Sequence, residues 1–283
     1  MLTRETSMAS SDSQEWQGRV GKSWASEWQR TDRSFRMLTS ELERRIAGSP
    51  YANLLDVGCG AGELSLVAAQ ARPEARVTGV DISPDLIDVA RLRSAGIPNV
   101  RFELADAASW RPGDGEIFDL QVSRHGVMFF DHPVAAFANL RAISAPGANL
   151  IFSCFRSLEE NPFFGLAGKL VDGGVSLPDP HAPGPFAFAD AERVHGILSD
   201  AGWCNVSIVP FDFQMIAGSG EDPVSDAVSY FSRIGPAARA ISLMDDMAKQ
   251  SFRMKLEGFV REHLSADEVA LGAAAWIVTA TRD

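Results

Sequence analysis

Between residues 53 and 155, the hydrophobic pattern of the chain alternates between two periods. Short apolar runs, typical of buried strands, occupy 53–57, 76–80, 100–104, 117–122 and 149–155. Between them apolar residues recur at helical spacing, as in Leu64, Val67, Ala68 and Ala71. Strands that are apolar throughout and alternate with helices predict a parallel sheet covered by helices on both faces.

The pattern changes on both sides of this region. Residues 16–47 place aromatic and aliphatic side chains at helical spacing, beginning with Trp24 and Trp28, and predict one or two amphipathic helices. We therefore expect a helical cover over residues 16–48. Residues 1–15 are polar and rich in Ser and Thr, which predicts a disordered lead without the apolar segment of a signal peptide.

Toward the C-terminus, strand-like runs at 203–213 and 275–281 enclose a helical segment at 222–265. This order predicts a helical cap at residues 214–270, inserted between the last two strands of a domain that spans 49–283. No internal repeat is visible in the sequence.

Composition limits the classes of function. The 283 residues carry a formal net charge of −11, which disfavours nucleic acid as a partner. No run of 18 apolar residues is present, so we expect no membrane span. Cys59, Cys154 and Cys204 are far apart, so a disulfide framework and a zinc site are both disfavoured and a cytoplasmic location is expected.

The most informative motif is the glycine-rich turn after the first strand of the alternating region. The apolar run ends in Asp56, and Gly58, Gly60 and Gly62 follow with the spacing G-x-G-x-G. Glycines allow a sharp turn and a close approach of the backbone to a ligand, and the following helix N-terminus offers free N–H groups. The dinucleotide fingerprint G-x-G-x-x-G would place the third glycine one position later.

This run resembles motif I of the class I S-adenosylmethionine (SAM)-dependent methyltransferases. The segment from Arg124 to Asp131, with Trp24 and Trp28 upstream, resembles the bacterial methyltransferases grouped with ubiquinone and menaquinone biosynthesis. The resemblance implies SAM as the cofactor. It also implies a doubly wound α/β fold with a seven-stranded, mostly parallel sheet of order 3-2-1-4-5-7-6, in which strand seven is antiparallel.

Residues after four strands are candidates for holding the cofactor. The loop at Gly58–Gly62 suits the methionyl carboxylate, and Asp56 is placed to meet the amino group. Asp81 follows the second strand, where an acidic residue binds ribose hydroxyls in this fold, and Ile82 would pack on adenine.

Two further positions complete the candidate cofactor site. The resemblance implies that Asp106 accepts the adenine amine and that Ala107 offers its backbone N–H to the ring. Ser123 and Arg124 follow the fourth strand and should border the transferred methyl group. Arg124 could hold an acidic acceptor or the SAM carboxylate, or form an ordinary ion pair.

The acceptor side is less defined by the sequence. His125 is a candidate general base, with hydrogen bonding to the backbone as the alternative. Trp24, Trp28, Phe129 and Phe130 could line an apolar pocket, or belong to the core. We expect a small, aromatic or apolar acceptor and no metal.

Other functions remain open from the sequence alone. A NAD-dependent oxidoreductase uses a related α/β frame, and a non-catalytic SAM-binding protein would keep the same pocket. The oligomeric state is open, with a homodimer as one possibility.

Overall fold

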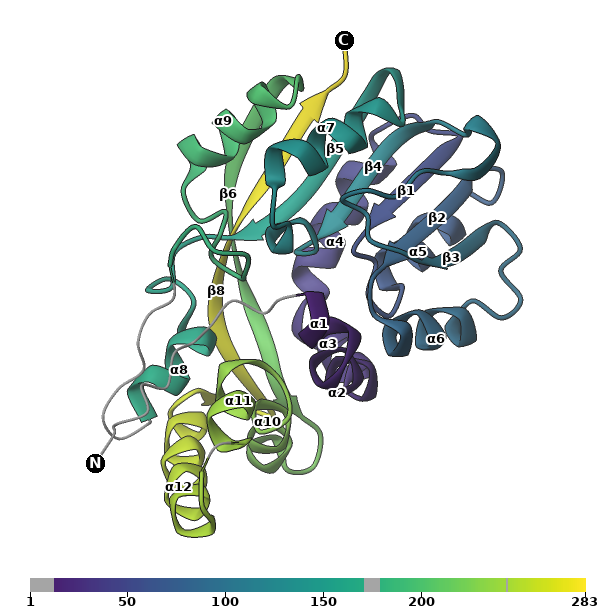
Figure 1. The fold of residues 1–283 in the computed structure, drawn as a ribbon. Helices are drawn as coiled ribbons and strands as arrows, with labels where there is room; N and C mark the ends of the chain where they lie inside the picture. Colours follow the sequence, from purple (N-terminus) through teal and green to yellow (C-terminus); the bar gives the residue numbers. More distant parts are fainter. Residues whose placement is uncertain (1–12, 171–178, 243) are drawn as a thin grey trace.

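The computed structural model describes residues 13–170, 179–242 and 244–283. Its centre is a mixed sheet, labelled in Figure 1, in the order β3-β2-β1-β4-β5-β8-β6, with the short β7 paired to β8. The strands are β1 (Asn53–Val57), β2 (Arg76–Asp81), β3 (Val100–Leu104), β4 (Phe118–Arg124), β5 (Ser144–Phe155), β6 (Cys204–Ser219), β7 (Leu264–Ser265) and β8 (Glu268–Thr281).

The strand directions confirm the fold expected from the sequence. Strands β1 to β5 pair in parallel, whereas β8 is antiparallel to both β5 and β6. Because β7 has two residues and lies outside the main path, β8 takes the place of the predicted seventh strand.

Helices cover both faces of the sheet. On one face α4 (Arg36–Ala47) packs against α5 (Glu63–Ala71), and on the other α7 (Pro133–Ala142) packs against α9 (Ala191–Asp200) (Figure 1). Helix α6 (Pro84–Arg93) contacts β2 and β3. It begins where expected, because the Ser83 hydroxyl accepts a hydrogen bond from the N–H of Leu86 and Pro84 occupies the first turn.

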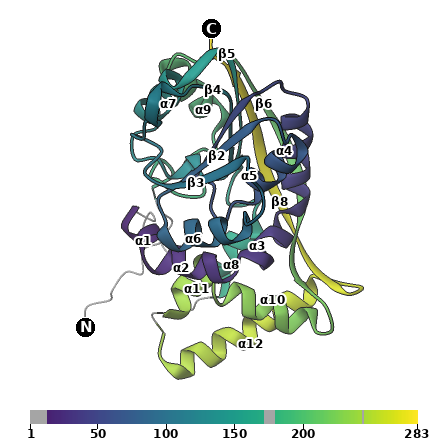
Figure 2. The same cartoon turned by 90° about the vertical axis from the view of Figure 1, so that its right-hand side faces the viewer.

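The N-terminal segment contains more helices than predicted. Instead of one or two there are α1 (Ser13–Gln17), α2 (Arg19–Ser26), α3 (Trp28–Ser34) and α4, separated by single residues at Gly18, Glu27 and Phe35. Residues 13–15, predicted to belong to the disordered lead, are helical, and residues 1–12 lie outside the described residues. Helix α2 packs against α6 (Figure 2).

Strands β6 and β8 are longer than predicted. Residues 214–219 and 268–270, expected in the helical insertion, belong to these strands, which pair as far as Ser219 and Glu268. The pairing of β5 with β8 ends at Phe155 and Ala275, so the distal part of β6 and β8 forms a ribbon beyond β5. Helices α10 (Pro223–Phe231), α11 (Gly235–Ser242) and α12 (Asp246–Glu262) lie at its end (Figure 1). Helix α8 (Pro162–Leu170) contacts α11.

Candidate functional site

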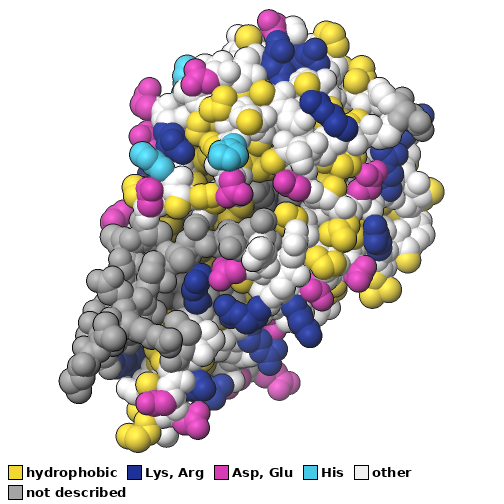
Figure 3. All heavy atoms as spheres, in the orientation of Figure 1, with side chains coloured by type: hydrophobic (Ala, Val, Ile, Leu, Met, Phe, Trp, Pro, Cys, Tyr) yellow, Lys and Arg dark blue, Asp and Glu magenta, His cyan; other side chains and the backbone are white. Residues whose placement is uncertain are grey.

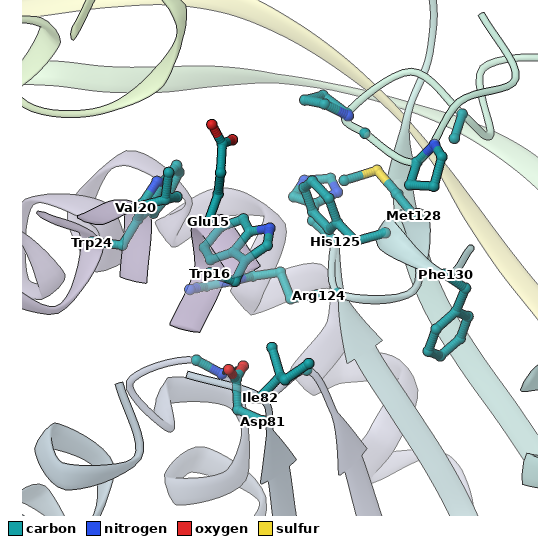
Figure 4. Close-up of a pocket in the computed structure, with 18 of the residues that line it drawn as sticks. Glu15, Trp16, Val20, Trp24, Asp81, Ile82, Arg124, His125, Met128 and Phe130 are labelled. Atoms are coloured by element: carbon teal, nitrogen blue, oxygen red, sulfur yellow. Dashed lines mark hydrogen bonds between the residues drawn. The ribbon is translucent and has the colours of Figure 1, made fainter. Parts of the chain in front are cut away.

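A cavity of about 850 Å³ opens at the carboxyl ends of the central strands. This edge of a parallel sheet is where α/β proteins bind ligands, and the volume lies in the upper part of the range for small-molecule sites. Figure 4 shows Trp16, Val20 and Trp24 of the N-terminal helices on one side, with Asp81 at the end of β2 and His125 after β4 facing the same space.

The glycine loop follows β1 and forms one wall. The backbone N–H of Gly58 donates to the carbonyl of Val80 at 2.8 Å, which ties the loop to β2. Gly58 has a φ of 65°, and a Cβ there would lie 2.8 Å from Cα of Gly126, so two backbones meet where a side chain cannot fit. At Gly60, with a φ of 54°, a Cβ would meet no atom within 4 Å, because this residue faces open space.

Asp81 joins the loop to the start of α6. One carboxylate oxygen accepts the N–H of Gly60 at 2.8 Å, and the other accepts the N–H of Ser83 at 2.8 Å. Burial raises the pKa of this carboxyl, while the backbone hydrogen bonds lower it. A carboxylate oxygen can accept more than one hydrogen bond, so Asp81 keeps acceptor capacity toward the cavity that it lines.

Asp56 lies deeper in the same wall. It is 1 % exposed, and its carboxylate accepts the Ser65 hydroxyl at 2.6 Å. Burial raises its pKa to about 6, against the opposing effect of the Ser65 hydrogen bond. The structure places Asp56 on the cavity wall, beside the glycine loop, as predicted from its position.

The loops after β2 and β3 bring the predicted adenine-side residues together. Ile82, Asp106 and Ala107 all line the cavity. Asp106 is exposed, and one of its oxygens accepts the N–H of Ala108 at 2.9 Å, whereas the other has no hydrogen-bond partner among the described residues.

Two predicted cofactor residues do not line the cavity. Ser123 is fully buried, and its hydroxyl donates to the carbonyl of Val57 at 2.7 Å and accepts the N–H of Gly126 at 3.1 Å, so it joins β1 to the turn after β4. Gly62 packs against β3, where a Cβ would lie 2.7 Å from the ring of Phe102. Both residues shape the site from behind instead of touching a ligand.

Arg124 lines the cavity but is occupied by ion pairs. Its guanidinium contacts Glu63 and lies 3.7 Å from Asp32 of α3, whose carboxylate also accepts from Arg93 at 2.7 Å. It donates to the Thr39 hydroxyl at 2.7 Å as well. The pKa of Asp32 is raised to about 7, mainly by burial and secondly by the neighbouring Glu63. Of the roles considered for Arg124, the structure therefore shows the ion pair, and this network fastens the N-terminal helices to the cofactor loop.

His125 has the most unusual conformation among the predicted residues. Its φ of 63° is in the left-handed region, which non-glycine residues rarely adopt. The ring stacks on Phe155 with centroids 3.9 Å apart and meets the edge of Phe35 at 5.5 Å. The pKa of His125 is lowered to about 3, mainly by burial and secondly by the nearby Arg124. The imidazole is therefore neutral at physiological pH.

The four predicted pocket residues Trp24, Trp28, Phe129 and Phe130 all line the cavity. Trp28 also stacks under the guanidinium of Arg93, 3.9 Å from its ring centroid. The prediction missed Trp16, whose ring lies 5.1 Å from Phe129 and 6.0 Å from Trp24. Its place on the aromatic face of the N-terminal segment was the available signal.

Segments far away in the sequence complete the cavity. Residues 182–187 contribute Pro183, Pro185 and Phe186, and the α10–α11 connection contributes Ile234. Across the opening, Glu15 of α1 pairs with Arg239 of α11 at 3.3 Å. No short sequence signal marks these residues, because they meet only through long-range packing.

The described part of the chain lacks the features of two other kinds of site. It contains no cluster of three or more His, Cys, Asp or Glu side chains arranged to hold a metal ion. None of its helices combines the length and the apolar character needed to cross a membrane.

Comparison with known proteins agrees with this geometry. Residues 49–180 match the model of a family described as "Methyltransferase domain". Trans-aconitate 2-methyltransferase of Paracidovorax citrulli is 34 % identical over 110 residues, which are 39 % of this chain and 41 % of that protein. Malonyl-[acyl-carrier protein] O-methyltransferase of a Paenibacillus species is 30 % identical over 122 residues, 41 % of this chain and 44 % of that protein. The match thus spans less than half of the length of these curated relatives.

The fold comparison reaches further along the chain. The crystal structure of the YcgJ protein from Bacillus subtilis superposes with a TM-score of 0.56 at 16 % identity, covering 87 % of this chain and 98 % of that one. At this identity the superposition shows a shared fold and no more. The family match covers the glycine loop, Asp81 and Asp106 together. Residues 49–180 of this chain are therefore similar to a methyltransferase domain.

Proposed function

We propose that this protein transfers a methyl group from SAM to a small acceptor molecule with an apolar or aromatic body. The observation that carries the proposal is the Asp81 carboxylate, which lies on the cavity wall and is fixed by the N–H groups of Gly60 and Ser83. A carboxylate held in this way is oriented to accept hydrogen bonds from two adjacent ribose hydroxyls.

The other residues at the glycine-loop end of the cavity suit the remaining parts of SAM. Open space beside Gly60 leaves room for a ligand against the backbone, and α5 begins directly behind the loop with its N-terminus toward it. Asp56 offers a carboxylate to an amino group, and the second carboxylate oxygen of Asp106 offers an acceptor to the adenine amine. The residues present therefore fit the cofactor that the domain family implies.

When bound, SAM supplies a methyl group already activated by its sulfonium. The protein then has two tasks, to align the acceptor and to exclude water, and alignment alone is worth up to about 7–11 kcal/mol in favourable intramolecular cases. The N-terminal helices and α11, connected by Glu15 and Arg239, cover the cavity and suit both tasks.

The walls of the cavity favour a small apolar acceptor. Aromatic rings dominate the side away from the glycine loop, among them Phe129, Phe155 and Phe164. On the face drawn in Figure 3, acidic and basic side chains are interspersed. With the net charge of −11, this distribution offers little attraction to a phosphate backbone. A cytoplasmic location and a possible homodimer stay predictions.

The two alternatives from the sequence are less well supported. The match to a methyltransferase family and the early third glycine do not favour a NAD-dependent oxidoreductase. A non-catalytic SAM-binding protein would share the cofactor end but show no turnover.

Calorimetric titration of the purified chain with S-adenosylhomocysteine (SAH), SAM and NADH tests the proposal. We expect saturable binding of SAH and SAM and none of NADH. Folded protein that binds neither SAH nor SAM would refute the proposed function, and NADH binding would favour the oxidoreductase. Methyl transfer from isotope-labelled SAM to a panel of small acids and phenols then separates an enzyme from a binding protein.

A further inference from the structure

Two buried nitrogen atoms at the acceptor end of the cavity have no hydrogen-bond partner among the described residues. One is Nε1 of Trp16, and the other is Nε2 of His125. Both side chains line the cavity, Trp16 from the N-terminal cover and His125 from the end of β4. In Figure 4 the indole nitrogen lies on the side of the Trp16 ring that faces His125. Buried polar groups are normally satisfied, so two unpaired nitrogen atoms in the lining of one cavity indicate a ligand.

The first of these nitrogens can only donate. An indole N–H has no lone pair available for hydrogen bonding, so Trp16 requires an acceptor atom on the ligand. Its neighbours Trp24 and Phe129 are aromatic and supply none through their rings.

The role of His125 depends on which nitrogen carries the proton. Its Nδ1 lies 3.5 Å from the hydroxyl oxygen of Ser153. Ser153 is fully buried, and the hydrogen bond of its hydroxyl is to this Nδ1. If Nδ1 carried the proton, it would donate to Ser153 and the Ser153 hydroxyl hydrogen would be buried without an acceptor. If the hydroxyl donates to Nδ1, every group in the pair is satisfied, and the ring proton lies on Nε2.

The surroundings of the His125 imidazole stabilise its neutral form. Phe35 and Phe155 enclose the imidazole, and among the described residues Arg124 is the charged group that acts on it. Both the desolvation and the positive charge oppose a second ring proton. His125 is thus a neutral side chain whose Nε2–H lies in the part of the cavity proposed for the methyl-accepting substrate.

Resting on the proposed function, we infer that Trp16 Nε1–H and His125 Nε2–H together bind a carboxylate of the acceptor, and that the methyl group is transferred to a carboxylate oxygen without a protein base. A carboxylate accepts hydrogen bonds and donates none, which matches two donors. The aromatic walls would take the apolar body to which it is attached.

The chemistry balances without a proton acceptor. A lone pair on the carboxylate oxygen forms the new O–C bond, while the C–S bond breaks and its electron pair stays on sulfur. The negative carboxylate and the positive sulfonium become a neutral ester and a neutral thioether, and no proton is released. A phenol or an amine would have to give up a proton, and His125 in this tautomer has no lone pair directed at the acceptor. The base role predicted for His125 is therefore replaced by a donor role.

The tautomer is tested directly in protein labelled with ¹⁵N-histidine. A long-range ¹H–¹⁵N correlation spectrum distinguishes protonated from unprotonated ring nitrogens, and the signals of His125 among the five histidines are identified by their absence in His125→Gln. We expect a proton on Nε2 and none on Nδ1, without change between pH 5 and 8. A proton on Nδ1 would overturn the inference.

The acceptor class is tested by titrating the SAH complex with cinnamate and cinnamyl alcohol, which share one apolar body. We expect cinnamate to bind at least about tenfold more tightly, and Trp16→Phe to remove most of this preference. Trp110→Phe is the matched control, because its indole donates to Glu103 away from the cavity. Equal affinity for both probes in the wild-type complex would overturn the assignment of a carboxylate.

Two substitutions of His125 distinguish a hydrogen-bond donor role of this side chain from a general-base role. Glutamine places an N–H close to the Nε2 position, whereas asparagine reaches only the Nδ1 position and tolerates the left-handed backbone. We expect His125→Gln to keep the preference for cinnamate and His125→Asn to lose it. Loss in both variants would contradict the donor role. Because SAH binding is measured first, failure of the proposed function appears as absent SAH binding, whereas failure of this inference leaves SAH binding intact.

Discussion

The two ends of the cavity are built in different ways. At the cofactor end, Asp56 and Asp81 lie at the carboxyl ends of β1 and β2 and Gly58 directly follows β1, all inside the segment that matches the methyltransferase family. At the acceptor end, α1 meets α11 through Glu15 and Arg239, which are 224 positions apart in the sequence. Parts of that end, among them the N-terminal helices, residues 182–187 and α11, lie outside the family match.

This difference shows what each end depends on. The cofactor end rests on hydrogen bonds between neighbouring loops, such as Gly60 N–H to Asp81. The acceptor end rests on packing between segments that touch only when the whole chain is folded. We therefore expect substitutions at one end to leave the other largely intact, except where the Asp32 network joins them.

The largest effect is expected at the cofactor end. Asp81→Ala removes the acceptor for the N–H groups of Gly60 and Ser83, and with it the ligand for the ribose hydroxyls. We expect the affinity for SAH, measured by calorimetry, to fall about 100-fold or more. Asp106→Ala, on the exposed rim, should cost about tenfold. Unchanged SAH affinity in a folded Asp81→Ala protein would mean that this end does not hold the ribose.

An intermediate effect is expected at the junction of the two ends. Asp32 is more readily protonated in the folded chain, with a pKa of about 7, than in the unfolded chain. The folded state thus binds more protons between about pH 4 and 7, and this contribution to stability is lost as pH rises through that window. Relative to Asp32→Asn, the wild type should lose about 1–3 kcal/mol of unfolding free energy between pH 5 and 8.

Urea denaturation of both proteins at several pH values measures this difference. Glu63, Arg93 and Arg124 face Asp32 and are unchanged in the variant, so the difference reports the Asp32 carboxyl together with its interaction with Glu63. Parallel pH profiles for the two proteins would show that Asp32 does not titrate in this range.

The smallest effect on the cofactor is expected from the acceptor end. Phe129→Ala removes the ring that meets Trp16 at 5.1 Å but touches none of the glycine loop's hydrogen bonds. We expect the SAH affinity to stay within about threefold of the wild type by calorimetry. A loss as large as that of Asp81→Ala would show that the two ends are energetically coupled, against the contrast drawn above.

The sequence predicted the cofactor end of the cavity better than the acceptor end. The strand order and the placement of Asp56, Asp81 and Asp106 on one cavity were predicted, because each residue lies at a fixed distance from a strand end. The errors at Ser123 and Gly62 are local as well: both are in the right loops, but their contacts point to the sheet instead of the cavity.

The acceptor end could not be predicted in the same way. Its aromatic residues occupy helical positions that serve core packing equally well, and the sequence pattern does not distinguish the two uses. The pairing of Arg124 with Glu63 and Asp32 needs the N-terminal helices in place, and nothing local to Arg124 indicates it. The bounds of β6 and β8 were missed because their distal pairing depends on each other, not on the sheet.

The position of β8 has a consequence for synthesis of the chain. This strand follows all the others in sequence, yet it lies between β5 and β6 in the sheet. While a ribosome is still producing the residues before 268, β6 has no strand through which to join the sheet, and the edge of β5 is unpaired on that side. The parallel core can form early, but completion of the sheet must wait for β8 to emerge, and until then the nascent protein exposes strand edges that chaperones can protect from aggregation.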